Sequence, residues 1–121
     1  MGVMLLENSF ESMIETIGPK AVMEDFEKML LIRQFEIRGE AAYQMGKVGG
    51  FYHAYIGQEA IQTAAVRVFG QDPWYIGFYR CHALALLLGA SPNELMAELY
   101  GKVTGNAKGR GGSMHFVTQR L

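Results

Sequence analysis

The longest helical pattern in this chain is residues 19–45, which read PKAVMEDFEKMLLIRQFEIRGEAAYQM. Pro19 suits the first position of a helix, because its missing N–H would have no partner there in any case. The apolar side chains of this segment fall on two faces: Phe26, Met29, Leu30 and Ile37 on one, and Leu31, Phe35, Ala42 and Met45 on the other. A single core contact would leave one face in water, so we expect a partner or a further part of a longer protein to cover it.

Three shorter helices are predicted downstream. Residues 58–69 repeat apolar side chains at helical spacing, and Gly70 suits the cap that ends them. A second helix is expected over residues 80–88. A third begins at Ser91-Pro-Asn-Glu94, which has the capping-box pattern, and it stops at Gly101.

Two stretches between these helices favour extended backbone. Residues 51–56 and 74–78 are rich in aromatic and β-branched side chains. The chain has no internal repeat, low-complexity tract or linker, so we expect one mainly α-helical unit with short extended segments.

Composition narrows the classes of partner. The chain has 121 residues and a formal net charge of −1, which gives no general attraction to nucleic acid or to anionic membranes. Its longest apolar run, residues 83–88, is far too short to span a bilayer. One cysteine, Cys81, cannot form an internal disulfide, and the start lacks a signal-peptide pattern, so a cytoplasmic location is expected.

The tail over residues 101–115 holds five glycines and three cations, Lys108 and Arg110 among them. Such a loop can present backbone N–H groups and positive charge to an anion, although it matches neither a P-loop nor a dinucleotide fingerprint. A flexible connector with solvated cations is the alternative that composition favours. Since the chain stops six residues later, we expect it to be the front of a longer protein whose later part supports this loop.

Tyr79-Arg80 stands where the second short helix is expected to begin. A cation in the first turn of a helix costs about 0.3–1 kcal/mol, because the macrodipole is positive there. A phosphate would offset this cost by binding the guanidinium and the free N–H groups together. A salt bridge from Arg80 to Asp72 or Glu98 would offset it as well, and the residues alone leave both alternatives open.

The three histidines are candidates for the same site. His53 follows two aromatic residues in a short connector, beside apolar surface that can tune an imidazole near neutrality. His82 and His115 could join it, but the spacing of the histidines does not suit a zinc site, so no metal held by this chain alone is expected. Cys81 lies between Arg80 and His82, yet a cysteine on an apolar helix is usually only packed.

Five blocks of sequence carry a resemblance to known proteins: Gly50-Phe-Tyr-His53, Tyr55-Ile-Gly-Gln-Glu-Ala60, Tyr79-Arg-Cys-His82, Glu98-Leu-Tyr-Gly101 and Lys108-Gly-Arg-Gly-Gly-Ser-Met-His115. Together they resemble one family, the alpha subunits of thiamine-diphosphate-dependent 2-oxo acid dehydrogenases. The resemblance covers residues 24–118 and leaves residues 1–23 as a variable lead before an incomplete domain over residues 24–121. The Gly-Gly-Ser-Met-His ending is similar to the pyruvate and acetoin branches, of which pyruvate is favoured.

The resemblance implies roles for four residues. His53 would be a positioning or proton-transfer group in catalysis, and Phe51 would line the substrate pocket beside it. Tyr79 and Arg80 would bind the diphosphate of thiamine diphosphate, which the phosphate alternative for Arg80 also favours. His82, Ser113 and His115 would lie near the site or support its loop.

The resemblance also implies an assembly. The family's α/β thiamine-diphosphate-binding fold holds Mg2+ through a Gly-Asp-Gly sequence and a later asparagine, and Gly-Asp-Gly is absent from this chain. The expected partners are a beta subunit in an alpha2beta2 assembly, a lipoyl acyltransferase and pyruvate, and we expect the chain alone to be inactive. An acetoin dehydrogenase alpha subunit and a non-enzymatic helical binding module are the alternatives.

Overall fold

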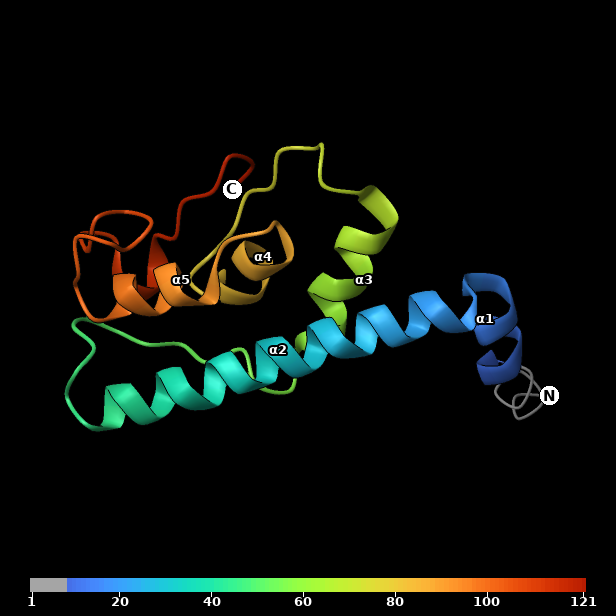
Figure 1. The fold of residues 1–121 in the computed structure, drawn as a ribbon, viewed down its shortest axis with the longest axis horizontal. Coiled ribbons are helices and arrows are strands. Elements are labelled where there is room, and N and C mark those ends of the chain that lie inside the picture. The colour runs from blue at the N-terminus through green and yellow to red at the C-terminus, as the bar shows by residue number, and fades with distance from the viewer. Residues whose placement is uncertain (1–8) are drawn as a thin grey trace.

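The computed structural model describes residues 9–121, and its long helix α2 runs beneath the other elements (Figure 1). Residues 1–8, the first part of the expected lead, lie outside the described part. The expected boundary after residue 23 falls within α2. The elements are α1 (Ser9–Ile17), α2 (Pro19–Gln44), α3 (Glu59–Phe69), α4 (His82–Leu87), α5 (Pro92–Leu99) and a 3-10 turn, η1 (Gly112–Met114).

Glycine and proline set the main helix boundaries as predicted. Gly18 has a φ of 86°, which breaks the chain between α1 and α2, and Pro19 occupies the start of α2. Gly70, with a φ of 77°, ends α3, and its N–H donates to the carbonyl of Val66. These positive φ values are open to glycine at little steric cost, which is why the sequence locates the breaks well.

The core lies where α2 meets α4 and α5. Every residue of α4 is buried, and Leu95 and Leu99 of α5 are almost fully enclosed. From α2, Ile32 and Phe35 reach the same cluster. Residues 9–121 contain no β-strand, and residues 51–55 and 74–78 run without regular secondary structure. The prediction of a mainly helical chain is therefore confirmed.

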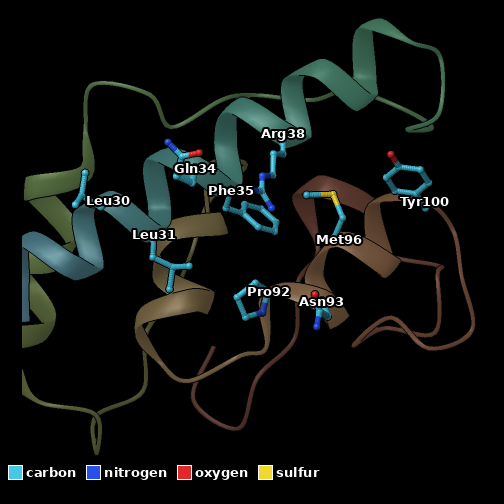
Figure 2. Close-up of a pocket in the computed structure, with 9 residues that line it drawn as sticks. All are labelled: Leu30, Leu31, Gln34, Phe35, Arg38, Pro92, Asn93, Met96 and Tyr100. Carbon is cyan, nitrogen blue, oxygen red and sulfur yellow. The ribbon is translucent and has the colours of Figure 1, made fainter.

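Apolar surface remains uncovered on α2, as its two-faced pattern predicts. Phe26, Leu30 and Ile37 are each close to half exposed. Part of this surface borders a hollow of about 510 Å3 between α2 and α5, into which Figure 2 shows Phe35 and Met96 projecting. What covers this surface stays a prediction.

One local prediction is wrong. Ser91 precedes α5 in extended conformation, but its side chain makes no capping hydrogen bond, so the capping box does not form. The helix predicted over residues 58–69 forms as α3, but its buried residues are Glu59, Thr63 and Val66, whereas the apolar Ile61 and Val68 are exposed. The carboxylate of Glu59 is buried because an arginine of α2 pairs with it, which an apolar pattern cannot reveal.

None of the helices in the described part of the chain is long and apolar enough to cross a membrane.

Candidate functional site

Four residues from two distant segments form one surface cluster. The rings of Phe51 and His53 are stacked with centroids 6.3 Å apart, and the His53 ring lies 4.6 Å from the Tyr79 ring. The guanidinium carbon of Arg80 lies 5.0 Å from the centroid of Tyr79. The structure thus brings together all four residues that the sequence assigns to substrate and cofactor, here called the aromatic–arginine cluster.

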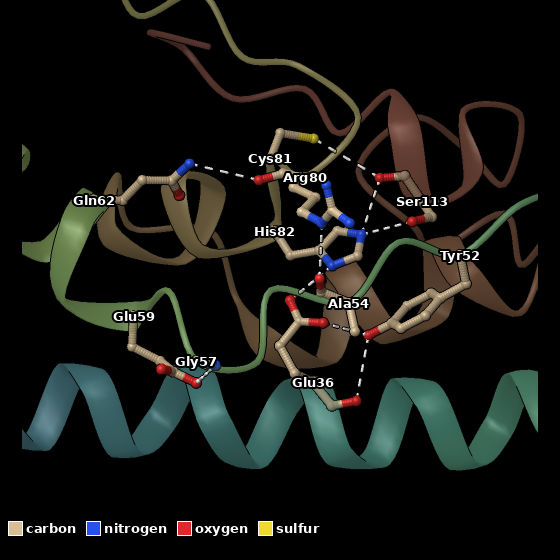
Figure 3. A network of polar contacts seen from close by, with 10 residues as sticks. All are labelled: Glu36, Tyr52, Ala54, Gly57, Glu59, Gln62, Arg80, Cys81, His82 and Ser113. Atoms are coloured by element: carbon tan, nitrogen blue, oxygen red, sulfur yellow. Dashed lines mark hydrogen bonds and ion pairs between the residues drawn. The ribbon is translucent and has the colours of Figure 1, made fainter.

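Arg80 is held by the backbone of the neighbouring segment. Its Nε donates to the carbonyl of Ala54 at 3.0 Å, and its Nη1 donates to the hydroxyl oxygen of Tyr79 at 3.2 Å. The carbonyl of Arg80 itself lies 3.5 Å from the side-chain nitrogen of Gln62 (Figure 3). The guanidinium therefore has a fixed direction.

The expected helix start at Arg80 is wrong, because α4 begins at His82 after an N-cap at Cys81. Arg80 thus lies outside the first turn and does not bear the cost of a cation there. The predicted alternative partners also fail: among residues 9–121 no carboxylate forms an ion pair with Arg80, neither Asp72 nor Glu98. The carbonyl of Ala54 and the hydroxyl of Tyr79 direct its guanidinium.

This arrangement fits an anionic group. A half-buried guanidinium without a carboxylate partner keeps hydrogen-bond donors free for phosphate oxygens, and a bidentate geometry suits that contact. The hydroxyl of Tyr79 adds a possible donor beside it. The cluster is also open to ligands, because Phe51 and Phe78 expose most of their side chains.

A buried polar network, drawn together with Arg80 in Figure 3, involves residues next to the cluster in the sequence. The ring of His82 is fully enclosed, with Nδ1 2.7 Å from Oε1 of Glu36 and Nε2 2.6 Å from the hydroxyl of Ser113. The hydroxyl of Tyr52 donates to Oε2 of Glu36 at 2.8 Å. These four residues, the Glu36 network, join α2, the 51–55 segment, α4 and η1.

Sequence reasoning missed half of this network. It kept His82 and Ser113 as possible neighbours of the site, but it gave Glu36 and Tyr52 no role. One signal was available: Glu36 lies between the apolar residues Phe35 and Ile37 of α2, and a carboxylate at a buried position needs hydrogen-bond partners. The partners of Glu36, Tyr52 and His82, come from two remote segments, so no local pattern identifies them.

The glycine-rich tail is neither a phosphate cradle nor a flexible connector. The carboxylate of Glu98, on α5, accepts N–H bonds from Gly109 at 2.8 Å and from Gly111 at 2.7 Å. It also accepts N–H bonds from Ala107 at 2.9 Å and Gly112 at 3.1 Å. Burial alone would raise the pKa of Glu98, but these donors outweigh burial and hold its pKa below the usual value. An internal carboxylate thus takes the place expected for an external anion.

Close packing requires glycine at several positions of this tail. A Cβ on Gly105 would lie 2.4 Å from a carboxylate oxygen of Glu98, and one on Gly109 would lie 2.5 Å from the backbone of Gly101. The loop is therefore held by α5, and the expectation that it has no support within this chain is wrong.

The remaining candidates, Cys81 and His115, are not members of the aromatic–arginine cluster. Cys81 is buried, and burial raises the pKa of its thiol, which disfavours the nucleophilic thiolate. His115 is exposed and does not join His82; it borders a cavity of about 230 Å3 together with Phe78. The described residues contain no group of three or more side chains that could hold a metal ion.

Comparison with known proteins assigns this helical chain, with its aromatic–arginine cluster and its buried network, to a family. Residues 27–120 match the family model described as the dehydrogenase E1 component. The chain belongs to this family.

The chain is also similar to individual members of this family. The chain is 46% identical over 93 residues to the pyruvate dehydrogenase E1 component subunit alpha of Rickettsia prowazekii (strain Madrid E), a match that covers 77% of this chain and 28% of that protein. It is 41% identical over 97 residues to the pyruvate dehydrogenase E1 component subunit alpha-3, chloroplastic, of Arabidopsis thaliana, covering 80% of this chain and 23% of the relative. The chain thus spans about a quarter of the length of these curated relatives.

Proposed function

We propose that this chain carries part of the cofactor and substrate site of a pyruvate dehydrogenase E1 component, in which Tyr79 and Arg80 bind the diphosphate of thiamine diphosphate. The observation that carries the proposal is the guanidinium of Arg80, which is fixed by Ala54 and has no carboxylate partner in residues 9–121. The names of the relatives support pyruvate over acetoin as the substrate.

His53 is proposed as the group that positions the 2-oxo acid or transfers a proton to it. Its half-buried ring is stacked on exposed Phe51 and lies 4.6 Å from the ring of Tyr79, so it adjoins both the exposed aromatic surface and the proposed diphosphate site. A neutral imidazole can accept or donate a proton near neutral pH. Phe51 would exclude water from one side of the substrate.

Thiamine diphosphate, when bound, supplies the carbanion-stabilising chemistry for oxidative decarboxylation and for transfer of the acyl unit to a lipoyl group. The protein's task at the cluster is to bind the diphosphate and to orient the substrate. Gly-Asp-Gly is absent from the chain, so we propose that the Mg2+ ligands lie outside these 121 residues. A beta subunit in an alpha2beta2 assembly and a lipoyl acyltransferase would complete the activity. The chain alone is expected to be inactive, and its cytoplasmic location stays a prediction.

Titration of the 121-residue chain with thiamine diphosphate, followed by calorimetry and by NMR of the Arg80 Nε–H, tests the proposal. Binding should shift this resonance, and Arg80→Ala should weaken binding by about 1.5–3 kcal/mol, the range for a charged hydrogen bond. Arg120→Ala is the matched control, because Arg120 is an exposed cation placed over Trp74 rather than over the cluster. Equal affinity in the Arg80 and Arg120 variants would remove Arg80 from the site.

A further inference from the structure

We propose that His82 is a positioning residue: through its hydrogen bonds with Glu36 and Ser113 it fixes the relative position of the two segments that carry His53 and Arg80. The inference rests on the proposed function in one respect, since it takes the aromatic–arginine cluster to be the cofactor site. The positioning itself is a property of the chain without a ligand.

His82 is placed to fix Arg80. It follows Arg80 by two residues and begins α4, and its ring is held from opposite sides by two hydrogen bonds. One partner, Glu36, belongs to α2, and the other, Ser113, belongs to η1. The ring can therefore neither rotate nor shift without breaking a buried hydrogen bond. Because Arg80 is only two residues away, the fixed position of His82 also limits the movement of the Arg80 backbone.

Tyr52 extends the same constraint to His53. Tyr52 lies between Phe51 and His53 in the chain, and its ring is stacked on His82 with centroids 5.0 Å apart. Its hydroxyl donates to Oε2 of Glu36 while His82 contacts Oε1. A single carboxylate thus fastens both segments of the cluster, one through each oxygen.

The network is too enclosed to react by itself. Serine, histidine and a carboxylate in this order also occur in hydrolases, where the hydroxyl must reach a substrate. Here Ser113 is 2% exposed and His82 and Glu36 are 0% exposed. Buried polar groups that are fully hydrogen-bonded specify one geometry, since any displacement would leave a buried polar group without its hydrogen bond, at a cost in free energy. Orientation of the cluster is the role that this arrangement supports.

Two variants test the inference on the isotopically labelled 121-residue chain. Ser113→Ala removes one support of His82, and Tyr52→Phe keeps the stacked ring but removes the bond to Glu36. Thr63→Val is the matched control, because it also removes a buried hydroxyl, one that only bonds the carbonyl of Glu59 within α3. Hydrogen exchange of the Arg80 Nε–H and the cross-ring NOE between His53 and Tyr79 are measured.

We expect Ser113→Ala to speed exchange of the Arg80 Nε–H by about 2- to 13-fold, the equivalent of one ordinary hydrogen bond. Tyr52→Phe should weaken the His53–Tyr79 NOE, and Thr63→Val should change neither quantity. Unchanged exchange and NOE in both network variants would overturn the inference, as would an equal effect of Thr63→Val. If Ser113→Ala does not fold, Tyr52→Phe decides by the NOE.

Thiamine diphosphate binding separates this inference from the proposed function. If the wild-type chain does not bind it, the proposed function fails, while exchange and NOE still decide whether His82 positions the cluster. If it binds, Ser113→Ala should weaken binding by a similar factor of about 2 to 13, and full affinity in a variant with disordered Arg80 would overturn the positioning role in binding.

Discussion

The backbone N–H of Gly109 donates to Oε2 of Glu98 at 2.8 Å, so the middle of the glycine-rich loop is fastened to helix α5. Four N–H groups of this loop share the same carboxylate, which makes it the anchor of residues 107–112. The loop continues into η1, where Ser113 contacts His82. Stability of the loop and order at the candidate site are therefore physically connected.

Glu98→Gln should destabilise the chain. An amide keeps the size of the carboxylate, but its NH2 group cannot accept the N–H bonds that one carboxylate oxygen now receives. We expect the free energy of unfolding to fall by about 1.5–3 kcal/mol, the range for hydrogen bonds to charged groups. Urea unfolding followed by circular dichroism measures it. Glu94→Gln, an exposed carboxylate on the same helix, should change little.

Acid should weaken the contact between α2 and α3 through Glu59. The hydrogen bond from Arg33 lowers the pKa of Glu59 to about 2. A carboxyl whose pKa is lower in the folded chain contributes stability above its unfolded pKa of about 4.3, and loses it as pH falls toward 2. The free energy of unfolding measured between pH 6 and pH 3 should fall less steeply in Glu59→Gln than in the wild type. The same slope in both proteins, with Glu27→Gln as the exposed control, would count against this coupling.

Gly39→Ala should be destabilising even though it lies within helix α2. Alanine normally favours a helix interior over glycine by about 1 kcal/mol. Here an added Cβ would lie 2.2 Å from the hydroxyl oxygen of Tyr52. We expect a net loss of about 1–3 kcal/mol, as for other overpacked sites, measured as a lower Tm.

The Gly39 prediction has an internal check. Tyr52→Phe removes the atom nearest to the new methyl group, so the double variant should lose less stability than the sum of the two single variants. Strict additivity would show that the methyl group added by Gly39→Ala does not press on Tyr52.

Ser91→Ala should have almost no effect on stability. Loss of a true N-cap serine costs typically about 1 kcal/mol, but the Ser91 side chain makes no capping hydrogen bond. We expect a change within about 0.5 kcal/mol in urea unfolding, as for ordinary surface positions. A loss near 1 kcal/mol would mean that the capping box forms in solution.

The sequence by itself determined the helical character, the start of α2 at Pro19, the end of α3 at Gly70, and the residues of the cluster. Helix boundaries are encoded locally, because proline and glycine fix or free the backbone at their own positions. Phe51, His53, Tyr79 and Arg80 were found through blocks of sequence that resemble a family, since no spacing rule joins residues so far apart in the chain.

Only the tertiary structure decided which groups pair. Glu98 was proposed as a partner of Arg80, yet it binds the glycine loop, and Glu36 had no predicted role, yet it joins Tyr52 to His82. Both outcomes depend on contacts between remote segments, and a buried carboxylate takes whichever donors the folded chain brings within reach. Local sequence sets the backbone, whereas burial decides where each charge must find its hydrogen bonds.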